Sequence, residues 1–569
     1  MFVASRTGGF SHALGPLRVR LHDPSPLLLP AAVFAGCFVA VTWRGRARGA
    51  ALAVVVAAVG LGAIALTQGA QRIFPIGDVA VLEMYARAAA AGRLMVGPYS
   101  RFGWHHPGPL YFYLIAPVYS AAGRNPAALA AGAAAIAIAS LALLTWMSAR
   151  SLGTFVSAAL LASNTAYLWR VPDVAASAWN PHVVILPTIA LVIAAAAVAG
   201  GDLALLPCLV ILASFVVQTD AALVPMAVAM AVMSTAAGVA AARRRGDGRS
   251  VRPRLNQAAW VAAMLWFVVA AEDMSHTPGN LTLLWRFFIG GGGHTQTFSA
   301  AVSAWATMLA GPLRGTFSLA TGGAFAAAGD GAPRTIAIIQ LVALATVVAW
   351  AARNRCASLA RLALLSLCAS LVALWSVSRI EDRIMDHQIF WISGLGALNL
   401  GIIAGAIGLR LRAYARWRLA PASAWLHGAL VATCLFISFT ELEAAHRGRL
   451  PVTLTNPATE RLGASVQAYM ADHQVRKPLV RIGEDVWGTT AGVLLELDRA
   501  GVPFAVEESW MPMFPQSFAA NGNEDAELAF VDTDEHLRLI TRPDNVPVAD
   551  TTAFYADAVP IQKCCSSPR

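Results

Sequence analysis

The chain has 569 residues, of which 57% are hydrophobic and 13% charged, and its mean hydropathy is +0.59. Soluble globular proteins carry about 25% charged residues, so this composition excludes a soluble protein and predicts a polytopic membrane protein. The formal net charge of +10 comes from arginine, since Lys477 and Lys563 are the only lysines. The arginines fall into short clusters rather than one patch, which indicates membrane orientation and excludes a nucleic-acid partner. The cysteines show no spacing typical of a disulfide framework.

Apolar segments recur along the chain at lengths near those needed to cross about 30 Å of hydrocarbon. They predict about eleven or twelve spans, several of them short enough to tilt, break or re-enter. The segments lie near 27–43, 51–68, 127–148, 154–169, 183–200, 203–219, 221–241, 257–271, 335–352, 359–376, 388–409 and 423–440.

Four arginine clusters orient these spans, at 44–48, 243–254, 353–361 and 410–418. Placing all four on the cytoplasmic side satisfies the positive-inside rule without contradiction. The outer face then receives 69–125, 170–182, 272–334, 377–387 and everything after about 441. The same parity leaves the N-terminus outside with Arg6, Arg18 and Arg20, so 27–43 is left open as a span.

The first predicted outer loop carries acids, histidines, arginine and aromatics. Asp78 opens a predicted helix over 79–91, either as its N-cap or as part of a site. Glu83 stands four residues before Arg87, which predicts a local ion pair. Because Asp78 and Glu83 lie about 140° apart around a helix, they are not expected to share a face.

The second half of this loop is the run 97–113, which includes Tyr99, Arg101, His105 and His106. Its glycines and prolines predict a shaped loop, followed by an aromatic helix over 110–121. Arginine is suited to a phosphate through its fork of donors, and histidine donates or accepts near neutral pH. The aromatic residues are also typical of a membrane-interface belt.

Further polar residues fall on the same predicted face. Asp173 lies in the second outer loop, and Asp220 lies at the junction of two spans with almost no loop between them. Burial of an acid at such a junction is costly, which makes Asp220 a candidate site residue. Carboxylates, arginines and histidines beside aromatics suit an amphiphile with a phosphate head and a lipid tail. No Gly-x-Ser-x-Gly elbow and no metal-ligand spacing is present in the sequence.

After about residue 441 the hydropathy falls and turn residues appear. The pattern predicts a helix over 458–473, a strand over 478–482 and a helix over 486–500 that Gly501 ends. Further strands are predicted at 503–506 and 527–531. The domains predicted are an N-terminal segment (1–50), a membrane core (51–440) and an outer α/β domain with its tail (441–569).

This pattern resembles the GT-C superfamily of membrane glycosyltransferases, and more narrowly bacterial proteins of the dolichyl-phosphate-mannose protein mannosyltransferase type (glycosyltransferase family 39). The resemblance covers about residues 50–440. It is carried by Gly77-Asp78 with Glu83, by His106-Pro107 leading into Leu110 to Tyr113, and by Asn180 to Pro187. The second element resembles the family's His-Pro-Pro-Leu-Tyr-Tyr segment, with Gly108 inserted between the prolines. The family's adjacent Asp-Glu pair is absent, because Val79 follows Asp78.

The resemblance implies a mainly α GT-C-type core in a bacterial inner membrane. It implies transfer of a sugar, with inversion, from a polyprenyl-phosphate donor to a glycan, lipid or protein acceptor on the outer face. Asp78 would then be the general base, Arg101 would hold the donor phosphate, and Asp173 would position the acceptor or assist Asp78. The remaining candidate substrate-binding residues are Glu83, Tyr99, His105, His106 and Asp220. No cofactor is predicted, and a divalent metal is left open.

Two other functions stay open from the sequence. A lipid-linked glycan flippase or transporter would place polar residues at mid-membrane depth, in broken helices or inverted repeats. Here the acids gather at the outer ends of spans instead, which favours chemistry at a lipid head. The third alternative is a non-catalytic scaffold in envelope assembly that uses the C-terminal domain for contacts.

Overall fold

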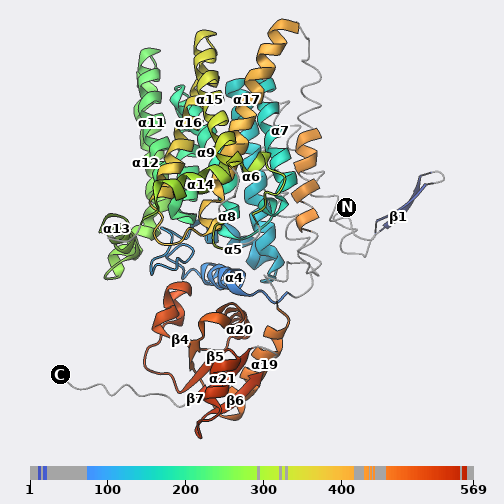
Figure 1. Ribbon diagram of the computed structural model, residues 1–569, viewed down its shortest axis with the longest axis vertical. Coiled ribbons are helices and arrows are strands. Elements are labelled where there is room, and N and C mark those ends of the chain that lie inside the picture. Colours follow the sequence, from blue (N-terminus) through green and yellow to red (C-terminus); the bar gives the residue numbers. More distant parts are fainter. Residues whose placement is uncertain are drawn as a thin grey trace.

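The computed structural model describes residues 10–14, 17–21, 73–290, 295–319, 323–326, 331–415, 429–434, 436–438, 440–442, 456–550 and 554–559. It is a long helical bundle with a small mixed domain at one end (Figure 1). The predicted spans at 27–43 and 51–68 lie outside the described residues. Before them, β1 (Phe10–Leu14) and β2 (Leu17–Leu21) form an antiparallel hairpin.

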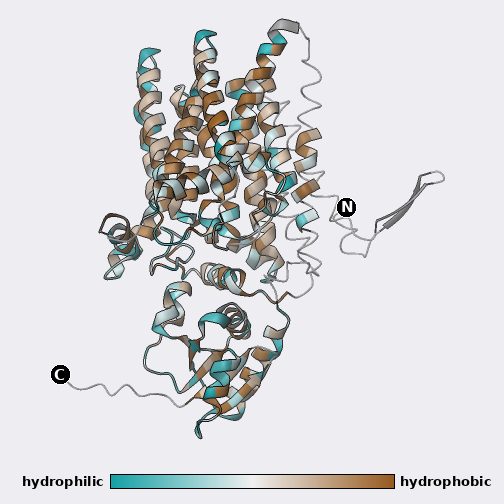
Figure 2. Ribbon diagram, viewed as in Figure 1, coloured by the Kyte–Doolittle hydropathy of each residue, from teal (hydrophilic) through white to brown (hydrophobic). Residues whose placement is uncertain are grey.

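The bundle confirms the mainly helical membrane fold. Seven helical segments in the described part of the chain are long and apolar enough to cross a membrane, and four shorter apolar helices accompany them. These helices are apolar along their length and hydrophilic at their tips (Figure 2). They are therefore the helices of an integral, multi-pass membrane protein. The helices before residue 280 are α4 (Gly77–Ala90), α5 (Leu110–Ala121), α6 (Ala127–Leu152), α7 (Thr154–Arg170), α8 (Asn180–Val183), α9 (Ile185–Ala199), α10 (Leu206–Thr219), α11 (Val224–Arg244) and α12 (Gly248–Ser275). Later come α13 (Asn280–Gly290), α14 (Phe298–Ala310), α15 (Ala332–Arg353), α16 (Ala357–Ser378) and α17 (Trp391–Ala415).

Arginines of two predicted clusters, 243–254 and 353–361, lie at one end of the bundle. Arg150, Asp202, Arg245 and Arg361 come from four different helix ends, yet they line one cavity and therefore share one end of the bundle. The other end carries α4, α5 and the C-terminal domain (Figure 1). That the arginine end faces the cytoplasm stays a prediction from the positive-inside rule.

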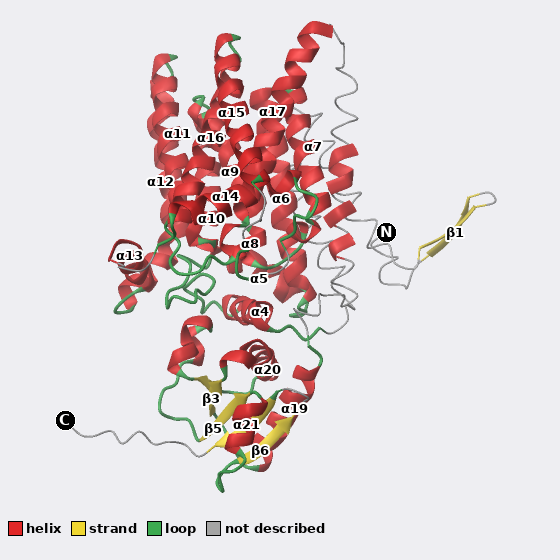
Figure 3. Cartoon of the chain, viewed as in Figure 1, coloured by secondary structure: helices red, strands yellow, loops and turns green. Residues whose placement is uncertain are grey.

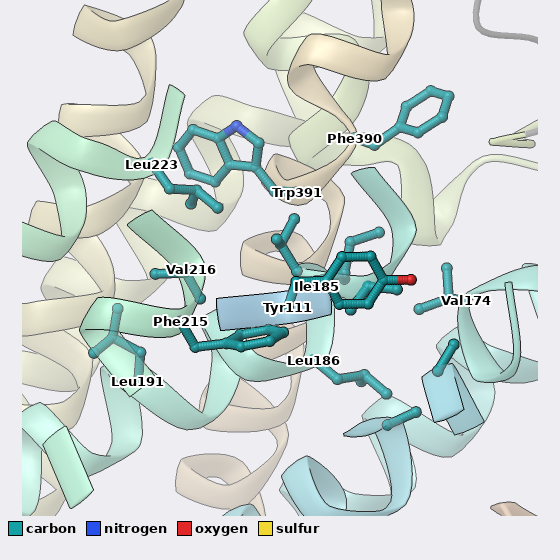
Figure 4. Close-up of a cluster of buried hydrophobic side chains, with 14 of the residues drawn as sticks. Tyr111, Val174, Ile185, Leu186, Leu191, Phe215, Val216, Leu223, Phe390 and Trp391 are labelled. Atoms are coloured by element: carbon teal, nitrogen blue, oxygen red, sulfur yellow. The ribbon is translucent and has the colours of Figure 1, made fainter. Parts of the chain in front are cut away.

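The core of the bundle lies where α5, α9, α10 and α17 meet. Tyr111, Ile185, Phe215 and Trp391 bring one large side chain from each of these helices into it (Figure 4). Every residue of α9 is buried, because its sequence is apolar on all sides and other helices surround it. This central helix fixes the loops at both ends of the bundle relative to one another.

The region predicted as one outer loop, 272–334, is partly bundle. It contains α13 and α14, and α14 buries Ala304 and Leu309 among its neighbours. Trp305 Nε1 on α14 donates a hydrogen bond to the Ser370 carbonyl of α16 at 2.8 Å. With 13 residues, α14 is shorter than a span needs, so the length criterion used on the sequence passed over it.

The C-terminal domain is the small α/β domain that the sequence predicted (Figure 3). Its strands are β3 (Pro478–Ile482), β4 (Ala505–Val506), β5 (Ala526–Val531), β6 (Val546–Asp550) and β7 (Tyr555–Val559), in the order β4-β3-β5-β7-β6. β3 pairs parallel with β4 and β5, while β7 pairs antiparallel with β5 and β6. Helices α19 (Ala458–Asp472) and α20 (Trp487–Ala500) confirm the two predicted helices, and Gly501 ends α20 at a φ of 72°. The short helix α21 (Thr533–Leu539), β6 and β7 were not predicted.

Two ion pairs fasten this domain to the bundle through α20 and α4. Arg499 donates to both oxygens of Glu83, at 2.9 and 2.6 Å, and Tyr119 donates to Glu83 at 2.8 Å. Arg87 pairs with Asp498. The predicted local pair between Glu83 and Arg87 is therefore wrong, because each finds its partner on α20. Glu83 is fully buried, with both oxygens engaged inside the protein.

Candidate functional site

Asp78 lies in the first turn of α4, half-buried, at the end of the bundle nearest the C-terminal domain. The N-cap of this helix is Ile76 and no side chain caps it, so the interpretation of Asp78 as an N-cap is wrong. Its Oδ1 accepts a hydrogen bond from the Tyr99 hydroxyl. Burial, and then the nearby Asp78 carboxylate, raise the pKa of Tyr99 well above its usual value, so this phenol stays a donor. Among the described residues no cation pairs with Asp78, which leaves a positioned carboxylate with acceptor capacity.

The run 97–108 is a tight hairpin rather than an open loop. Gly97 N donates to the His106 carbonyl at 3.1 Å, and His106 N donates to the Pro98 carbonyl at 2.8 Å. Tyr99 and His105 face each other across it. A Cβ at Gly97 would lie 2.6–2.7 Å from three backbone carbonyl oxygens, so only glycine fits at this close approach.

The junction of α10 and α11 holds this hairpin in place. The Gln218 carbonyl accepts from Gly108 N at 3.4 Å, and its Oε1 accepts from Leu110 N at 3.3 Å. One step further, Ala221 N donates to His106 Nδ1 at 2.8 Å. The structure thus brings the predicted residue His106 beside the junction that carries Asp220, from more than a hundred residues away.

Asn280, at the start of α13, also holds the hairpin in place. Its Oδ1 accepts from His105 N at 2.8 Å, and its Nδ2 donates to the His105 carbonyl at 3.0 Å. Asn280 N in turn donates to the buried Glu272 carboxylate at 2.9 Å. The sequence placed residues 272–334 on the same predicted outer face as the hairpin. It gave no signal that the Asn280 side chain would bond to the backbone of His105.

Both histidines of the hairpin are neutral at physiological pH. Burial lowers the pKa of His105 to about 4. Burial, and then the neighbouring imidazoles of His105 and His387, lower the pKa of His106 to about 3. Among the described residues, His105 Nε2 and the Tyr85 hydroxyl are buried atoms without a hydrogen-bond partner, and their rings lie 6.2 Å apart. Since buried polar atoms normally have partners, these two are suited to a hydroxyl group of a bound molecule.

Arg101 is exposed at the tip of the hairpin. Its Nη2 donates to the Arg383 carbonyl at 3.0 Å, and its guanidinium stands 4.9 Å from the centre of the Phe102 ring. Arg383 is exposed as well. Two guanidinium-bearing residues thus lie next to each other on the predicted outer end, an arrangement that favours an anion.

Asp173 lies apart from the hairpin, in the short 3-10 helix Pro172–Ala175. It stands within electrostatic range of His182, whose ring stacks 5.5 Å from Phe390. In the described chain no contact joins Asp78, Arg101 and Asp173 directly. Asp173 and Asp386 both lie within electrostatic range of His182, and Arg101 donates to the Arg383 carbonyl in the segment that carries Asp386.

No protein-family model and no curated protein matches the chain. The solved structures that resemble it include ArnT from Cupriavidus metallidurans bound to undecaprenyl phosphate, and the same protein in the apo state. The first is 14% identical at a TM-score of 0.48, covering 89% of this chain and 97% of that one. The second is 14% identical at a TM-score of 0.47, covering 90% and 98%. At this identity and TM-score the likeness supports no statement about what this chain binds or transfers.

The described residues offer an acid suited to proton exchange, Asp220, but no cluster of metal ligands. Within the described residues, no group of three or more His, Cys, Asp and Glu is placed so as to hold a metal ion. Asp220, by contrast, is buried, and burial raises its pKa from 3.8 to about 7, although a hydrogen bond from Ala222 N at 3.0 Å acts in the other direction. A carboxyl with this pKa exchanges its proton near neutral pH.

This raised pKa predicts a pH-dependent stability. Because Asp220 binds a proton more tightly folded than unfolded, its contribution is present at low pH and lost as pH rises through about 7. Between about pH 6 and about pH 8 the loss is about 1.4 kcal/mol. Asp220→Asn is expected to remove this slope, measured as the difference in thermal unfolding temperature at the two pH values. An unchanged slope in the variant would show that Asp220 is already ionised.

Proposed function

We propose that the chain is an integral membrane glycosyltransferase of GT-C type that transfers a sugar from a polyprenyl-phosphate donor to a glycan, lipid or protein acceptor at the outer face, with inversion. The observation that carries this proposal is the Asp78 carboxylate, aligned by Tyr99 and without a cation partner among the described residues. Tyr99, which donates to this carboxylate from outside α4, stands on the same hairpin as Arg101 and the neutral histidines. A base, a phosphate-binding group and uncharged hydrogen-bonding groups are thereby collected at one end of the bundle.

In the proposed reaction, the acceptor displaces the phosphate in a single step. The acceptor hydroxyl oxygen forms a bond to the anomeric carbon while the bond from that carbon to the phosphate oxygen breaks. Asp78 takes the hydroxyl proton, and the phosphate leaves with the bonding electron pair. Attack from the side opposite the leaving group inverts the anomeric configuration. Asp173, which lies within electrostatic range of His182, is proposed to position the acceptor.

Arg101 and Arg383 are proposed to neutralise the leaving phosphate. The Arg101 guanidinium donates one hydrogen bond within the protein, to the Arg383 carbonyl, and its fork carries several further N–H donors. Charge on the phosphate increases as the sugar leaves, so these donors stabilise the transition state more than the bound donor. The imidazoles of His105 and His106, being neutral, are suited to sugar or acceptor hydroxyls rather than to the phosphate.

The test is a transfer assay with the purified full-length protein. Labelled polyprenyl-phosphate sugars are supplied with a panel of envelope glycans, lipids and peptides, and the label is followed into the acceptor. Transfer supports the proposal, and analysis of the anomeric configuration tests inversion. Absence of transfer with every donor, together with movement of the labelled lipid across vesicle membranes, would replace it with the flippase.

Arg101→Gln is expected to lower kcat/KM for the donor roughly tenfold or more, because one charge-assisted hydrogen bond to phosphate is lost. Donor titrations of the variant and the wild type measure this. Arg286→Gln on α13 is the matched control, since it removes an equally exposed arginine from the same end of the bundle. Equal losses in both variants would show that general charge, and not a phosphate contact, is responsible.

The flippase alternative requires usable polar groups at mid-span depth. The described bundle has a buried polar cluster of this kind in α15, α16 and α17, formed by Gln340, Ser366, Ser370 and Asn399. Its members bond to one another: Ser366 donates to Asn399 at 2.7 Å, and Asn399 donates to Gln340 at 3.3 Å. Gln340 also donates to the Leu309 carbonyl at 3.1 Å. A cluster satisfied internally is suited to holding helices together, which favours the transferase.

A further inference from the structure

A cavity of about 430 Å³ opens at the end of the bundle opposite the candidate site. Its charged lining consists of Arg150, Arg245 and Arg361 with Asp202. Arg150 lies in the last turn of α6, Arg245 follows α11 directly, and Arg361 lies in the first turns of α16. The cavity therefore sits at the depth where spans end and a lipid headgroup lies.

Positive charge is in excess within this cavity. Asp202 pairs with Arg150 at 2.9 Å, so it does not compensate the other two arginines. Arg245 and Arg361 instead act on each other as like charges. Arg245 Nη1 donates to the Gly200 carbonyl at 3.0 Å, and Arg361 Nη2 donates to Ser358 at 3.1 Å. Arg361 Nε is buried and has no hydrogen-bond partner in the part of the chain that the structure describes. An anion placed between the two arginines would satisfy this donor and remove the repulsion.

The backbone at the cavity floor is shaped for these two guanidinium groups. Gly200 and Gly201 follow α9, and Gly201 has a φ of +88°. A Cβ at Gly200 would lie 2.7 Å from Arg361 Nη2, and a Cβ at Gly201 would overlap Arg245. A side chain at Gly200 would have to displace the tip of Arg361, and the positive φ at Gly201 favours glycine beside Arg245.

The apolar residues that line the rest of the cavity indicate whether its ligand is a soluble anion or a lipid. Leu152, Ile193 and Leu362 add apolar walls to the same cavity. A small soluble anion has no use for such walls, whereas the glycerol and first acyl carbons beneath a lipid phosphate bury apolar surface against them. Basic pockets between helices at a membrane surface are suited to anionic headgroups.

We propose that this cavity binds the phosphate headgroup of an anionic membrane lipid between Arg245 and Arg361, in the leaflet opposite the candidate catalytic site. The guanidinium forks hold the phosphate oxygens, and the apolar walls hold the carbons below it. This site is independent of the proposed transfer reaction, since it shares none of its residues. Occupancy would tie the ends of α9, α11 and α16 together.

The test is lipid binding by the purified full-length protein in detergent, read by native mass spectrometry and by thermal stabilisation. Short-chain phosphatidic acid, phosphatidylcholine and inorganic phosphate are the probes. The wild type is expected to bind phosphatidic acid about tenfold more tightly than phosphatidylcholine, and Arg245→Gln with Arg361→Gln is expected to abolish this preference. Arg243→Gln with Arg353→Gln is the matched control, because it removes two exposed arginines from the same end outside the cavity.

Three outcomes would overturn the proposal: an unchanged preference in the cavity variant, an equal loss in the control, or equal stabilisation by inorganic phosphate at matched concentration. The last would assign the site to a soluble phosphate. If the double variant does not fold, Arg361→Gln alone keeps the test, because Arg245 retains its bond to Gly200. That single variant is expected to weaken phosphatidic acid binding about tenfold while leaving phosphatidylcholine binding unchanged.

Discussion

Asp78→Asn is expected to lower the rate of sugar transfer by about 10²- to 10⁴-fold, the contribution typical of a general base. The amide keeps the size of the side chain and still accepts a hydrogen bond from Tyr99, but it takes no proton from the acceptor hydroxyl. Donor binding is therefore expected to stay near that of the wild type while kcat falls. Steady-state transfer kinetics and donor binding, measured on the same preparation, separate the two effects.

Two control variants make the Asp78 result specific. Asp382→Asn removes an exposed acid from the same end of the bundle and is expected to leave kcat unchanged. Tyr99→Phe removes the hydrogen bond that orients Asp78, so a smaller fall in kcat is expected, because the base is present but less well aligned. Transfer that survives Asp78→Asn undiminished would remove the base assignment, whatever the controls show.

Arg499→Gln is expected to destabilise the protein by about 3–5 kcal/mol, the cost of breaking a buried ion pair by removing one partner. The Glu83 carboxylate is completely buried, and Arg499 is 14% exposed. Arg499 also donates to Glu496 at 2.6 Å, so its loss leaves two acids facing each other. Burial by itself would lower the pKa of Arg499, but pairing with Glu83 outweighs it and raises the pKa above the usual range. Thermal unfolding and limited proteolysis between the bundle and the C-terminal domain measure the effect.

Arg481→Gln is the matched comparison within the same domain. Arg481 is more exposed than Arg499 and pairs at longer range, 3.6 Å from Glu527. Such pairs contribute about 0–1 kcal/mol, so this variant is expected to unfold close to the wild type. If both variants were equally stable, the pair between Glu83 and Arg499 would not be what joins the domain to α4.

Local patterns predicted most of the elements. Within the described residues, the predicted apolar segments from 127 to 409 correspond to helices, and α19, β3 and α20 lie within a residue or two of their predicted bounds. Such elements are encoded within a few turns of chain, by apolar periodicity and by residues such as Gly501. By contrast, α14 was missed because its 13 residues are too few for a span, and its burial depends on three neighbouring helices.

Side-chain pairing could not be predicted in the same way. The i to i+4 spacing predicted a pair between Glu83 and Arg87, yet their partners, Arg499 and Asp498, lie more than 400 residues later. Position in a helix likewise predicted Asp78 as an N-cap, whereas the Tyr99 hydroxyl, on the following hairpin, donates a hydrogen bond to it. Residue spacing along the sequence describes only local geometry. A long-range ion pair that is buried away from water couples its two residues more strongly than an exposed local pair does.

The sequence by itself determined the membrane class and the small C-terminal α/β domain, because composition and local apolar period act over short stretches of chain. Only the tertiary structure decided which polar groups meet. It joined Asp78 to Tyr99, placed Gln218 and Asn280 around His105 and His106, and used Glu83 to anchor α20. It also collected Arg150, Arg245 and Arg361 from three separate turns into one cavity. Contacts of this kind depend on how helices far apart in sequence pack together, and no local pattern encodes that packing.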